Sequence, residues 1–508
     1  MKKIHFFSLV MAAAMTAVAI TGCGKDDDHK QDYNPLIDDP TPEQPSTPTD
    51  PQPQSNYSEL YRPQIHFTPA KNWMNDPNGM VYVDGTWHLF YQYNPQGNDW
   101  GNMSWGHATS TDLVHWSEQP VALTRDELGD IFSGSCVIDK DNTAGFGANA
   151  MVAIYTSASG AQQQSIAYST DGGKNFTRYS GNPVIKNDDD NLRDPKVFWH
   201  EGSKQWVMTL AKGWKMGVEF YTSPDLKNWT HQSTFFTELS GRPSLQWECP
   251  DLIQLGEKWV LLVSVNPGGP ILGSGSMYFV GDFDGKTFTA DALDYPLWLD
   301  YGMDNYAGVT WSNTGSRKVM IGWMNNWQYA GAVPCSPWRS AMTLPRELKL
   351  IDYNGKPLLA STVVSEIDKI AGNWQTAGNS LDVKDAYQLR IKLNLDKNST
   401  ITLGNSSDEK FTIDINAQDR KLTAHRTSAS GQTGFNGTFS VPSMQAPLCV
   451  TESTVTLDIF VDQSSVEIFT STGSVSMTNL VFPKSIYNTL SVVGDTYEAQ
   501  VRKLNRIW

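Results

Sequence analysis

Three acidic residues precede apolar segments in a repeated sequence context. Asp76 lies in "NWMNDPNGMVY", Asp194 in "RDPKVFWH" and Glu248 in "ECPDLIQL". Each acid is followed, directly or after one residue, by proline and then by an alternating apolar segment. Each also stands eleven or twelve residues before a tryptophan that opens a further apolar run. These tryptophans are Trp87, Trp206 and Trp259. The shared context predicts that the three carboxylates occupy equivalent positions in three copies of one structural unit.

Three carboxylates in one place could serve as a metal site, as a clamp for sugar hydroxyls, or as a pair for acid–base and nucleophilic chemistry. A single Asp-Pro pair is usually only a capped turn, but three in one context need a use, because clustered like charges are costly to bury. No histidine accompanies the trio, and Arg193 beside Asp194 keeps that carboxylate ionised. Both features argue against a metal. In glycosyl transfer, one carboxylate attacks the anomeric carbon and a second, protonated one donates to the leaving oxygen.

The elements that would position these acids recur along the first two thirds of the chain. Five apolar runs rich in aromatic and β-branched residues read as strands. They are "WHLFYQYN", "MVAIYTS", "QWVMTLAK", "KWVLLVSV" and "KVMIGWMN". Aspartate-containing turns follow four of the runs, and their aspartates are Asp112, Asp171, Asp225 and Asp284. Repeated four-stranded units without long helices predict a five-bladed β-propeller over residues 57–350. A β-sandwich with similar strand spacing is the alternative.

The propeller prediction explains how acids far apart in sequence could meet. The first strand of each propeller blade lines the central axis, so equivalent positions in different blades converge on one cavity. From about residue 357 the pattern changes to strict polar–apolar alternation, as in "YQLRIKLNL" and "TLDIFVDQSSVEIFT". Such alternation is typical of half-buried antiparallel strands. It predicts a β-sandwich over residues 357–508 that supports the propeller.

The N-terminal residues have the pattern of a processing signal. Two lysines precede an apolar run that ends in "ITGC" at Cys23. This resembles a bacterial lipoprotein signal, with residues 1–22 removed and Cys23 lipidated; an ordinary secretory peptide is the alternative. The following "GKDDDHK" resembles the surface-export signal of Bacteroides-like lipoproteins. Residues 23–56 are rich in Pro, Asp and Thr, which predicts an extended tether that begins at a lipid anchor. The protein would then be attached to the outer membrane, either exposed on the cell surface or on the periplasmic face.

The amino-acid composition excludes some classes of binding partner. The net charge of −15 over 508 residues argues against nucleic acid. The 18 Trp, 19 Tyr and 20 Phe would serve either a large core or platforms for ring-shaped ligands. Besides Cys23 there are four widely spaced cysteines without zinc-like spacing. They are Cys136, Cys249, Cys335 and Cys449. No metal and no cofactor are expected.

At this point the motifs resemble those of a known family. "NWMNDPNG", "FSGS" at 132–135, "RDP" at 193–195 and "EC" at 248–249 are similar, in this order, to motifs of glycoside hydrolase family 32. That family comprises levanases, inulinases and invertases, which cleave β-fructofuranosides, and Bacteroides surface fructanases are among the proteins this chain resembles. The later blocks "NWQYAGAVPCSPWRSAMTLPREL" and "DIFVDQSSVEIF" resemble the family too. The resemblance implies a five-bladed propeller followed by a β-sandwich.

The resemblance also implies roles for individual residues. Asp76 would be the nucleophile, Glu248 the general acid and then base, and Asp194 the transition-state stabiliser that binds fructose hydroxyls. Two successive displacements imply retention of configuration. Seven further residues would surround the fructose, the polar ones binding hydroxyls and the aromatic ones forming walls. They are Asn75, Gln92, Trp100, Phe132, Ser133, Arg193 and Trp323.

The motifs do not determine which β-fructofuranoside is the substrate. The block that begins at Asn326 looks more like levanases and inulinases than like sucrose-only invertases, which favours a fructan, with levan preferred and inulin as the other polymer. An exo-acting β-fructosidase or invertase that releases fructose is the alternative. Two other functions are considered: an arabinan- or xylan-cleaving propeller enzyme, against which "NDPNG" and "FSGS" together argue, and a surface glycan-binding lipoprotein without catalysis. The intact acids argue against the last.

Overall fold

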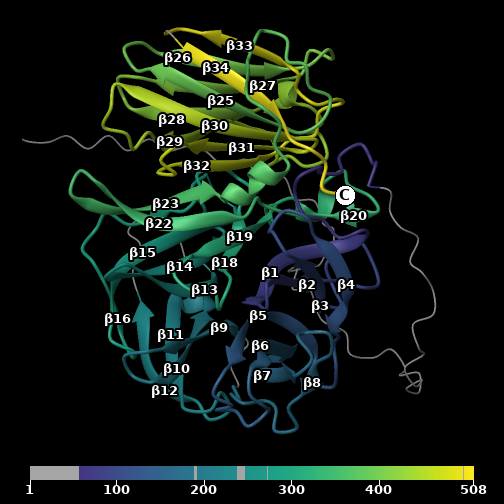
Figure 1. Cartoon of the computed structure of the whole chain (residues 1–508), viewed down its shortest axis with the longest axis vertical. Helices are drawn as coiled ribbons and strands as arrows, with labels where there is room; N and C mark the ends of the chain where they lie inside the picture. Colours follow the sequence, from purple (N-terminus) through teal and green to yellow (C-terminus); the bar gives the residue numbers. More distant parts are fainter. Residues whose placement is uncertain (1–56, 188–190, 237–245, 272, 496) are drawn as a thin grey trace, which may run out of the picture. The chain divides into compact units, whose positions relative to one another are not determined.

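The computed structural model describes residues 57–187, 191–236, 246–271, 273–495 and 497–508. The predicted signal segment, Cys23 and the tether up to residue 56 therefore lie outside the described residues. The described chain forms a five-bladed β-propeller followed by a β-sandwich, which confirms the predicted fold class (Figure 1).

Each blade is one antiparallel sheet whose first strand is innermost. In the first blade the strands are β1 (Asn72–Val83), β2 (Thr86–Tyr93), β3 (Ser104–Ser110) and β4 (Ser117–Leu123). In the second they are β5 (Asp130–Asp139), β6 (Ala150–Ser159), β7 (Ala161–Ser169) and β8 (Thr177–Arg178). In the third they are β9 (Leu192–His200), β10 (Gln205–Lys212), β11 (Gly217–Ser223) and β12 (Thr230–Phe236), with the short 3-10 helix η1 (Gly213–Lys215) between β10 and β11.

The last two blades carry additional short strands. The fourth contains β13 (Gln246–Leu255), β14 (Lys258–Asn266), β15 (Gly275–Phe283), β16 (Phe288–Ala290) and β17 (Leu297–Trp298). The fifth contains β18 (Tyr306–Thr310), β19 (Val319–Met324), β21 (Ala341–Met342), β22 (Arg346–Tyr353) and β23 (Lys356–Val363). The strand β20 (Trp338–Arg339) pairs in parallel with β1, and η2 (Ala330–Ala332) precedes it. Because β23 pairs with β22, the fifth blade extends to Val363, past residue 357 where the sequence pattern changes.

The five innermost strands form a closed ring. Each of β1, β5, β9, β13 and β18 contacts the next, and β18 contacts β1. The ring closes through backbone hydrogen bonds: Tyr82 N–H donates to the Ser312 carbonyl, and Ser312 N–H donates to the Met80 carbonyl, both over 3.0 Å. The five predicted apolar runs form the second strands β2, β6, β10, β14 and β19, which confirms the blade repeat.

The four predicted aspartate turns join the third and fourth strands of the first four blades. In each, one carboxylate oxygen accepts hydrogen bonds from two backbone N–H groups two to four residues further on, a turn that Asp readily forms. Asp225 Oδ1, for example, accepts from Lys227 N over 3.0 Å and from Asn228 N over 2.8 Å. The corresponding bonds of Asp112, Asp171 and Asp284 lie between 2.7 and 3.1 Å. These aspartates are therefore structural.

A β-bulge interrupts every innermost strand. In β1, Met74 pairs with Tyr93 and Pro77 with Tyr91, so three steps on the inner strand match two on its neighbour. The same single extra residue occurs in β5, β9, β13 and β18. Bulges bend a strand and redirect its side chains, and they accommodate proline, which cannot complete a ladder. The prolines after the acids accordingly lie in the bulge or directly after it.

The sandwich consists of two antiparallel sheets. One has the order β24 (Gln375–Thr376), β34 (Tyr497–Lys503), β25 (Tyr387–Asn394), β30 (Thr454–Asp462), β31 (Ser465–Thr470) and β32 (Ser476–Leu480). The other has the order β29 (Val441–Pro447), β28 (Lys421–Arg426), β27 (Lys410–Asn416), β26 (Ser399–Gly404) and β33 (Thr489–Val493). Alternating side chains such as Leu389, Ile391 and Ile413 meet in a shared core. Short 3-10 helices lie at η3 (Ser365–Lys369) and η4 (Ser428–Ser430).

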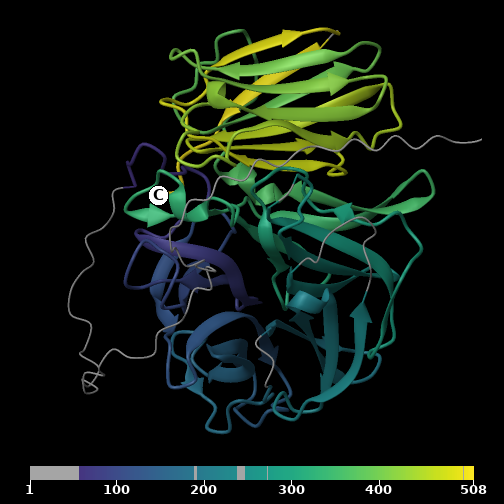
Figure 2. The ribbon, with the colours of Figure 1, turned by 180° about the vertical axis from the view of Figure 1, so that it is seen from behind.

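Buried ion pairs join the sandwich to the fifth blade, where the two meet in Figures 1 and 2. Arg346 Nη1 lies 2.9 Å from Asp300 Oδ2, and its Nη2 lies 2.6 Å from Glu467 Oε1 in β31. Arg426 Nη1, from β28, lies 2.5 Å from Asp304 Oδ2. All of these side chains are excluded from solvent, so each charge depends on its partner.

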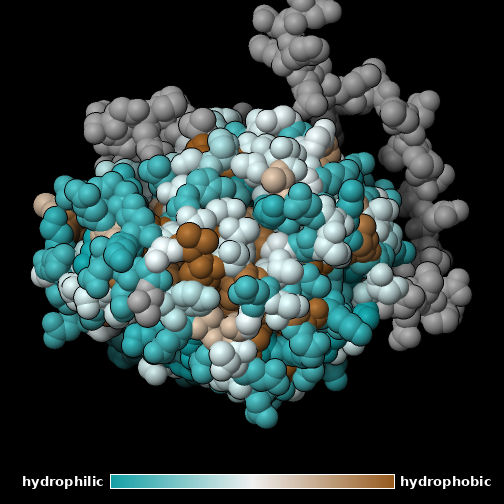
Figure 3. All heavy atoms as spheres, turned by 90° about the horizontal axis from the view of Figure 1, so that it is seen from above, coloured by the Kyte–Doolittle hydropathy of each residue, from teal (hydrophilic) through white to brown (hydrophobic). Residues whose placement is uncertain are grey.

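The face in Figure 3 is largely hydrophilic, with scattered hydrophobic residues near its centre. No helix in the described part of the chain is long and apolar enough to cross a bilayer. The four cysteines after residue 57 are free thiols, three of them buried.

Candidate active site

The bulges of three neighbouring inner strands bring the three predicted acids together. Asp76 comes from β1, Asp194 from β9 and Glu248 from β13. Each acid lies at the bulge of its own strand, but at a different position. Glu248 is the last paired residue before the bulge, Asp194 is the first of the two unpaired bulge residues, and Asp76 is the second. The prediction of strictly equivalent positions was therefore wrong in detail. Because the blades are arranged in a ring, side chains at equivalent positions already approach the ring axis from different directions, and the offset shifts each acid by one residue along its own strand.

Asp76 is a buried carboxylate held by three donors. Ser133 Oγ donates to its Oδ2 over 2.7 Å, and Asn75 Nδ2 donates to its Oδ1 over 3.0 Å. The thiol of Cys249 lies 3.5 Å from Oδ2. Burial and the nearby charge of Glu248 raise the pKa of Asp76, and the three donors act against that rise. The donors thus favour the ionised form that a nucleophile requires.

Glu248 is surrounded by donors on both oxygens. Arg193 Nη2 lies 2.6 Å from Oε1, and Gln246 Nε2 donates to the same oxygen over 3.0 Å. The hydroxyl of Tyr306 donates to Oε2. Burial and the charge of Glu248 raise the pKa of Tyr306 far above its usual range, so this phenol keeps its proton and remains a donor.

Asp194 lies between these two groups. Its Oδ2 accepts the backbone N–H of Cys249 over 3.1 Å and lies 3.5 Å from Arg193 Nε. The same oxygen lies 3.8 Å from the Cys249 sulfur that contacts Asp76. Burial raises the pKa of Asp194, the Arg193 guanidinium lowers it, and the carboxylates of Glu248 and Asp76 raise it. Arg193 and Cys249 thus connect all three acids.

Cys249 is a protonated donor in this arrangement. Burial, followed by the three neighbouring carboxylates, raises the pKa of its thiol far above the usual range. A thiolate nucleophile is excluded by this environment. Its backbone adopts φ 49°, and Asp194 adopts φ 59°, a left-handed conformation that the bulge imposes on non-glycine residues.

The predicted fructose-binding residues lie in two groups. Asn75, Ser133 and Arg193 contact the acids directly, as described above. Gln92 is buried, and its Nε2 donates to the Ile131 carbonyl over 3.0 Å. With its amide oriented to satisfy its neighbours, Asn78 accepts from Gln92 Nε2 over 3.0 Å and donates to Ser133 Oγ over 3.2 Å. Because Ser133 donates to Asp76, these bonds link Gln92 to Asp76.

The predicted aromatic residues differ in exposure. Trp100 is 50% exposed and meets Phe132 edge-on with ring centroids 6.2 Å apart. Trp323 is fully buried and contacts Tyr306 at 6.4 Å and Trp327 at 4.8 Å. Trp327 is partly buried and stacks on Trp73 with ring centroids 5.9 Å apart.

Three residues that contact the site were not predicted from the sequence. Tyr306 and Gln246 bond Glu248 directly, and Asn78 connects Gln92 with Ser133. Tyr306 begins the fifth inner strand and pairs with Trp323 in the register in which Glu248 pairs with Ser264, a relation that only the strand pairing reveals. In the neighbouring segment "DYGMDNYAG", Asp304 pairs with Arg426 of the sandwich.

The described residues contain no group of three or more His, Cys, Asp or Glu side chains arranged to hold a metal ion. The three acids face donors from Ser133, Asn75, Arg193 and Tyr306 instead. Three neighbouring carboxylates held by such donors can perform acid, base and nucleophilic steps.

Comparison with known proteins agrees with this chemistry. The N-terminal domain of glycosyl hydrolases family 32 matches residues 66–361, and the family's C-terminal domain matches residues 360–507. The chain therefore belongs to glycoside hydrolase family 32, a family of retaining glycosidases, and not to the arabinan- or xylan-cleaving propeller enzymes.

Individual relatives cover most of the chain. A levanase of Bacillus subtilis is 46% identical over 463 residues, which is 84% of this chain and 67% of that protein. An extracellular exo-inulinase of Aspergillus niger is 41% identical over 85% of this chain and 91% of its own length. Among solved structures, an exo-inulinase from Aspergillus awamori superposes with a TM-score of 0.82 at 36% identity, covering 89% of this chain and 100% of that one.

Proposed function

We propose that this protein hydrolyses β-fructofuranosidic bonds of fructans by a retaining double displacement, with levan as the preferred polymer. The observation that carries the proposal is the convergence of Asp76, Asp194 and Glu248 from three blades of a family 32 propeller. The class of enzyme, a fructan-cleaving glycosidase, has the support of relatives named levanase and exo-inulinase.

In the first displacement, Asp76 attacks the anomeric carbon of the fructosyl unit while Glu248 transfers a proton to the departing glycosidic oxygen. The product is a fructosyl ester of Asp76 and a shortened sugar chain with a free hydroxyl. Glu248, now a carboxylate, takes a proton from water, and the resulting hydroxide attacks the same carbon and releases Asp76. Each displacement inverts the carbon once, so the released fructose end retains its configuration.

The surrounding residues have matching tasks in this proposal. Asp194 binds fructose hydroxyls and stabilises the positive charge that develops on the ring. Asn75, Ser133 and Cys249 keep Asp76 ionised between turnovers, as their hydrogen bonds favour the anion. Trp100 and Phe132 offer apolar walls to the sugar ring.

A product time course tests the proposal and settles its finer points. Purified residues 57–508 would be incubated with levan, inulin and sucrose, and the products separated by size. Early short oligosaccharides would indicate cleavage within the chain, whereas fructose alone from the start would indicate the exo-acting alternative, a β-fructosidase or invertase. Relatives of both kinds exist: the exo-inulinase above, and a levanbiose-producing levanase of Bacillus subtilis that is 38% identical over 87% of this chain.

The alternative function, glycan binding without catalysis, predicts a different result in this experiment. A non-catalytic glycan-binding protein would retain fructan but release nothing, and Glu248→Ala would behave like the parent. The three intact acids and their donors favour catalysis. If no substrate is cut under any condition, the binding function replaces the catalytic one.

We further propose that the protein is a lipoprotein anchored through Cys23, in the manner of Bacteroides surface fructanases, at the outer membrane and exposed on the cell surface. Support comes from the apolar segment that ends in "ITGC" and from the Pro-rich residues that follow. Replacing Cys23 with Ser should release the protein from the membrane fraction, and protease treatment of intact cells should distinguish surface exposure from the periplasmic face.

A further inference from the structure

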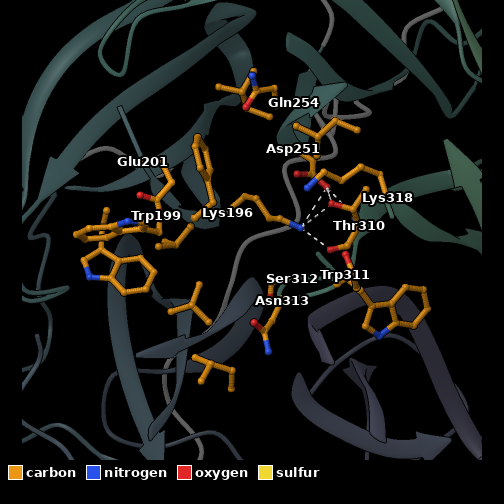
Figure 4. A pocket seen from close by; sticks show the side chains of 18 of the residues that line it. Lys196, Trp199, Glu201, Asp251, Gln254, Thr310, Trp311, Ser312, Asn313 and Lys318 are labelled. Carbon is orange, nitrogen blue, oxygen red and sulfur yellow. Dashed lines mark hydrogen bonds and ion pairs between the residues drawn. The ribbon is translucent and has the colours of Figure 1, made fainter. Parts of the chain in front are cut away.

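A cavity of about 590 Å³ lies in the propeller but does not include the three acids (Figure 4). Most of its lining comes from later residues of the inner strands of blades two to five and from the segment after β18, whereas the acids lie nearer the beginning of their strands. Figure 4 shows Trp199 and Glu201 on one side, Asp251, Thr310 and Lys318 on the other, and Lys196 extending between them. The volume falls within the range of about 300–1,000 Å³ typical of small-molecule sites.

A charged network occupies one part of this cavity. Lys196 Nζ lies 3.1 Å from Asp251 Oδ2 and 3.2 Å from Thr310 Oγ1. The backbone N–H and the hydroxyl of Thr310 donate to the same carboxylate oxygen over 2.6 and 2.7 Å. Asp251 Oδ2 is thus fully engaged by protein groups.

Two polar groups of the cavity are not satisfied by the protein. Asp251 is completely buried, and its Oδ1 has no hydrogen-bond partner among the described residues. Lys318 lines the same cavity, and in the described part of the chain its ammonium takes part in no hydrogen bond or close ion pair. An unpaired buried polar atom is unfavourable, so Asp251 Oδ1 favours a ligand that can donate to it. Lys318 is only partly buried, and its ammonium can donate to the same ligand.

The charges of the lining select the class of ligand. The lining carries charges of both signs: three lysines, which would repel a cation, and four acids, which would oppose an anion. They are Lys140, Lys196 and Lys318, and Asp139, Asp141, Glu201 and Asp251. A neutral molecule with several hydroxyl groups avoids both penalties, because each hydroxyl both donates and accepts. Trp199 supplies an aromatic surface and is itself packed edge-on against Trp206, with ring centroids 5.2 Å apart. Aromatic surface with a few polar groups is the usual composition of a site for such a ligand.

We propose that this cavity is a second carbohydrate-binding site, separate from the acids, which holds a short fructose oligosaccharide. The choice of fructose as the sugar rests on the proposed function, while the neutral polyhydroxylated class rests on the cavity itself. Asp251 Oδ1 accepts a sugar hydroxyl, Lys318 donates to another, and Trp199 packs against the ring.

The test counts bound sugar in full-length protein that cannot cleave it. Asp76→Ala would be dialysed to equilibrium against the trisaccharide 1-kestose at high protein concentration, and the number of bound molecules per chain measured. We expect two at saturation. Adding Lys318→Ala or Trp199→Ala to Asp76→Ala should reduce the number to one, and adding Lys349→Ala, an exposed lysine outside the cavity, should leave it at two.

Three results would overturn the inference: one bound trisaccharide in Asp76→Ala, two retained in both cavity variants, or binding of inorganic phosphate that Lys318→Ala removes. Melting temperatures identify any variant that fails to fold, and the two cavity variants are independent of each other. Hydrolysis of fructan by the parent protein is measured separately, so failure of the proposed function is distinguishable from failure of this site.

Discussion

Arg193 Nη2 lies 2.6 Å from Glu248 Oε1, while Nε of the same guanidinium lies 3.5 Å from Asp194 Oδ2. One cation therefore holds two of the three acids in a fixed relation, on strands β9 and β13 of different blades. A planar guanidinium can serve two carboxylates at once, whereas an ammonium is a single point charge.

The first prediction concerns this bridge. Arg193→Lys keeps the charge but loses the double contact, so we expect kcat/KM on sucrose or levan to fall by about 10²–10³-fold, the usual loss for a misplaced electrostatic group. Arg178→Lys, which alters a surface pair with Asp126, serves as the matched control and should change activity little. Equal activity of the two variants would contradict the bridge.

The second prediction distinguishes the proposed general acid, Glu248, from the proposed nucleophile, Asp76. Glu248→Gln cannot protonate a sugar leaving group, so turnover of sucrose should drop by about 10²–10⁴-fold. β-Fructofuranosyl fluoride needs no such proton, and we expect a rapid burst of about one fluoride per chain, followed by slow turnover because the base for the second step is missing. Asp76→Asn should show no burst. A burst in Asp76→Asn, or none in Glu248→Gln, would reverse or remove these assignments.

The third prediction concerns the acidic limb of the pH–rate profile. Ser133 donates to Asp76 and so acts against the rise in pKa caused by burial and by Glu248. Ser133→Ala removes that donor, raises the pKa of Asp76 further, and should move the acidic limb to higher pH by roughly half to one unit, since one hydrogen bond contributes about 1 kcal/mol. Ser157→Ala, which removes a hydroxyl bonded to Ser165 in the second blade, should leave the limb in place.

The fourth prediction concerns stability at alkaline pH. Buried His66 lies 2.7 Å from both Asp462 and Glu467, and hydrogen bonds to these two acids outweigh its burial and raise its pKa to about 9. The folded protein then holds a proton that the unfolded chain loses near pH 6.5. This stabilisation is complete below pH 6.5 and disappears as the pH rises through 9, a loss of roughly 3 kcal/mol.

Thermal melts between pH 6 and 10 measure this effect. His66→Gln should flatten the decline, whereas His231→Asn, at an exposed position, should retain it. An unchanged decline in His66→Gln would assign the pH dependence to other groups.

The fifth prediction concerns the contact between sandwich and propeller. Arg426→Ala leaves Asp304 buried without its cation, which should lower the free energy of unfolding by about 3–5 kcal/mol. Arg125→Ala, which breaks an exposed pair with Asp130, should change it by less than about 1 kcal/mol. Urea denaturation compares the two. Because Asp304 lies two residues before Tyr306, the partner of Glu248, the buried variant should also reduce activity.

Much of the architecture was predictable because local patterns carry it. The five apolar runs, the aspartate turns and the alternating strands after residue 357 each reflect short-range periodicity, which the structure confirms strand by strand. The three acids were identifiable because each stands in the same context of acid, proline and apolar strand.

What the sequence could not supply depends on contacts between distant segments. The bulge in each inner strand is visible only in the pairing register, and it decides that Glu248, Asp194 and Asp76 occupy successive positions. Tyr306 bonds Glu248 from a different blade, and Gln246 bonds it from the beginning of the same strand, and no local pattern distinguishes either from ordinary strand residues.

The chain itself, through its repeats and its three acidic motifs, determined the propeller, the sandwich and the candidate catalytic carboxylates, because periodicity and motif are properties of neighbouring residues. Only the tertiary structure decided which donors face each carboxylate, and that Arg193 and Cys249 join all three. It also decided that Asp251 and Lys318, unremarkable in sequence, line one cavity beyond the acids. Hydrogen bonds and charge interactions act over a few ångströms in space, and the ring of blades brings together residues more than a hundred positions apart.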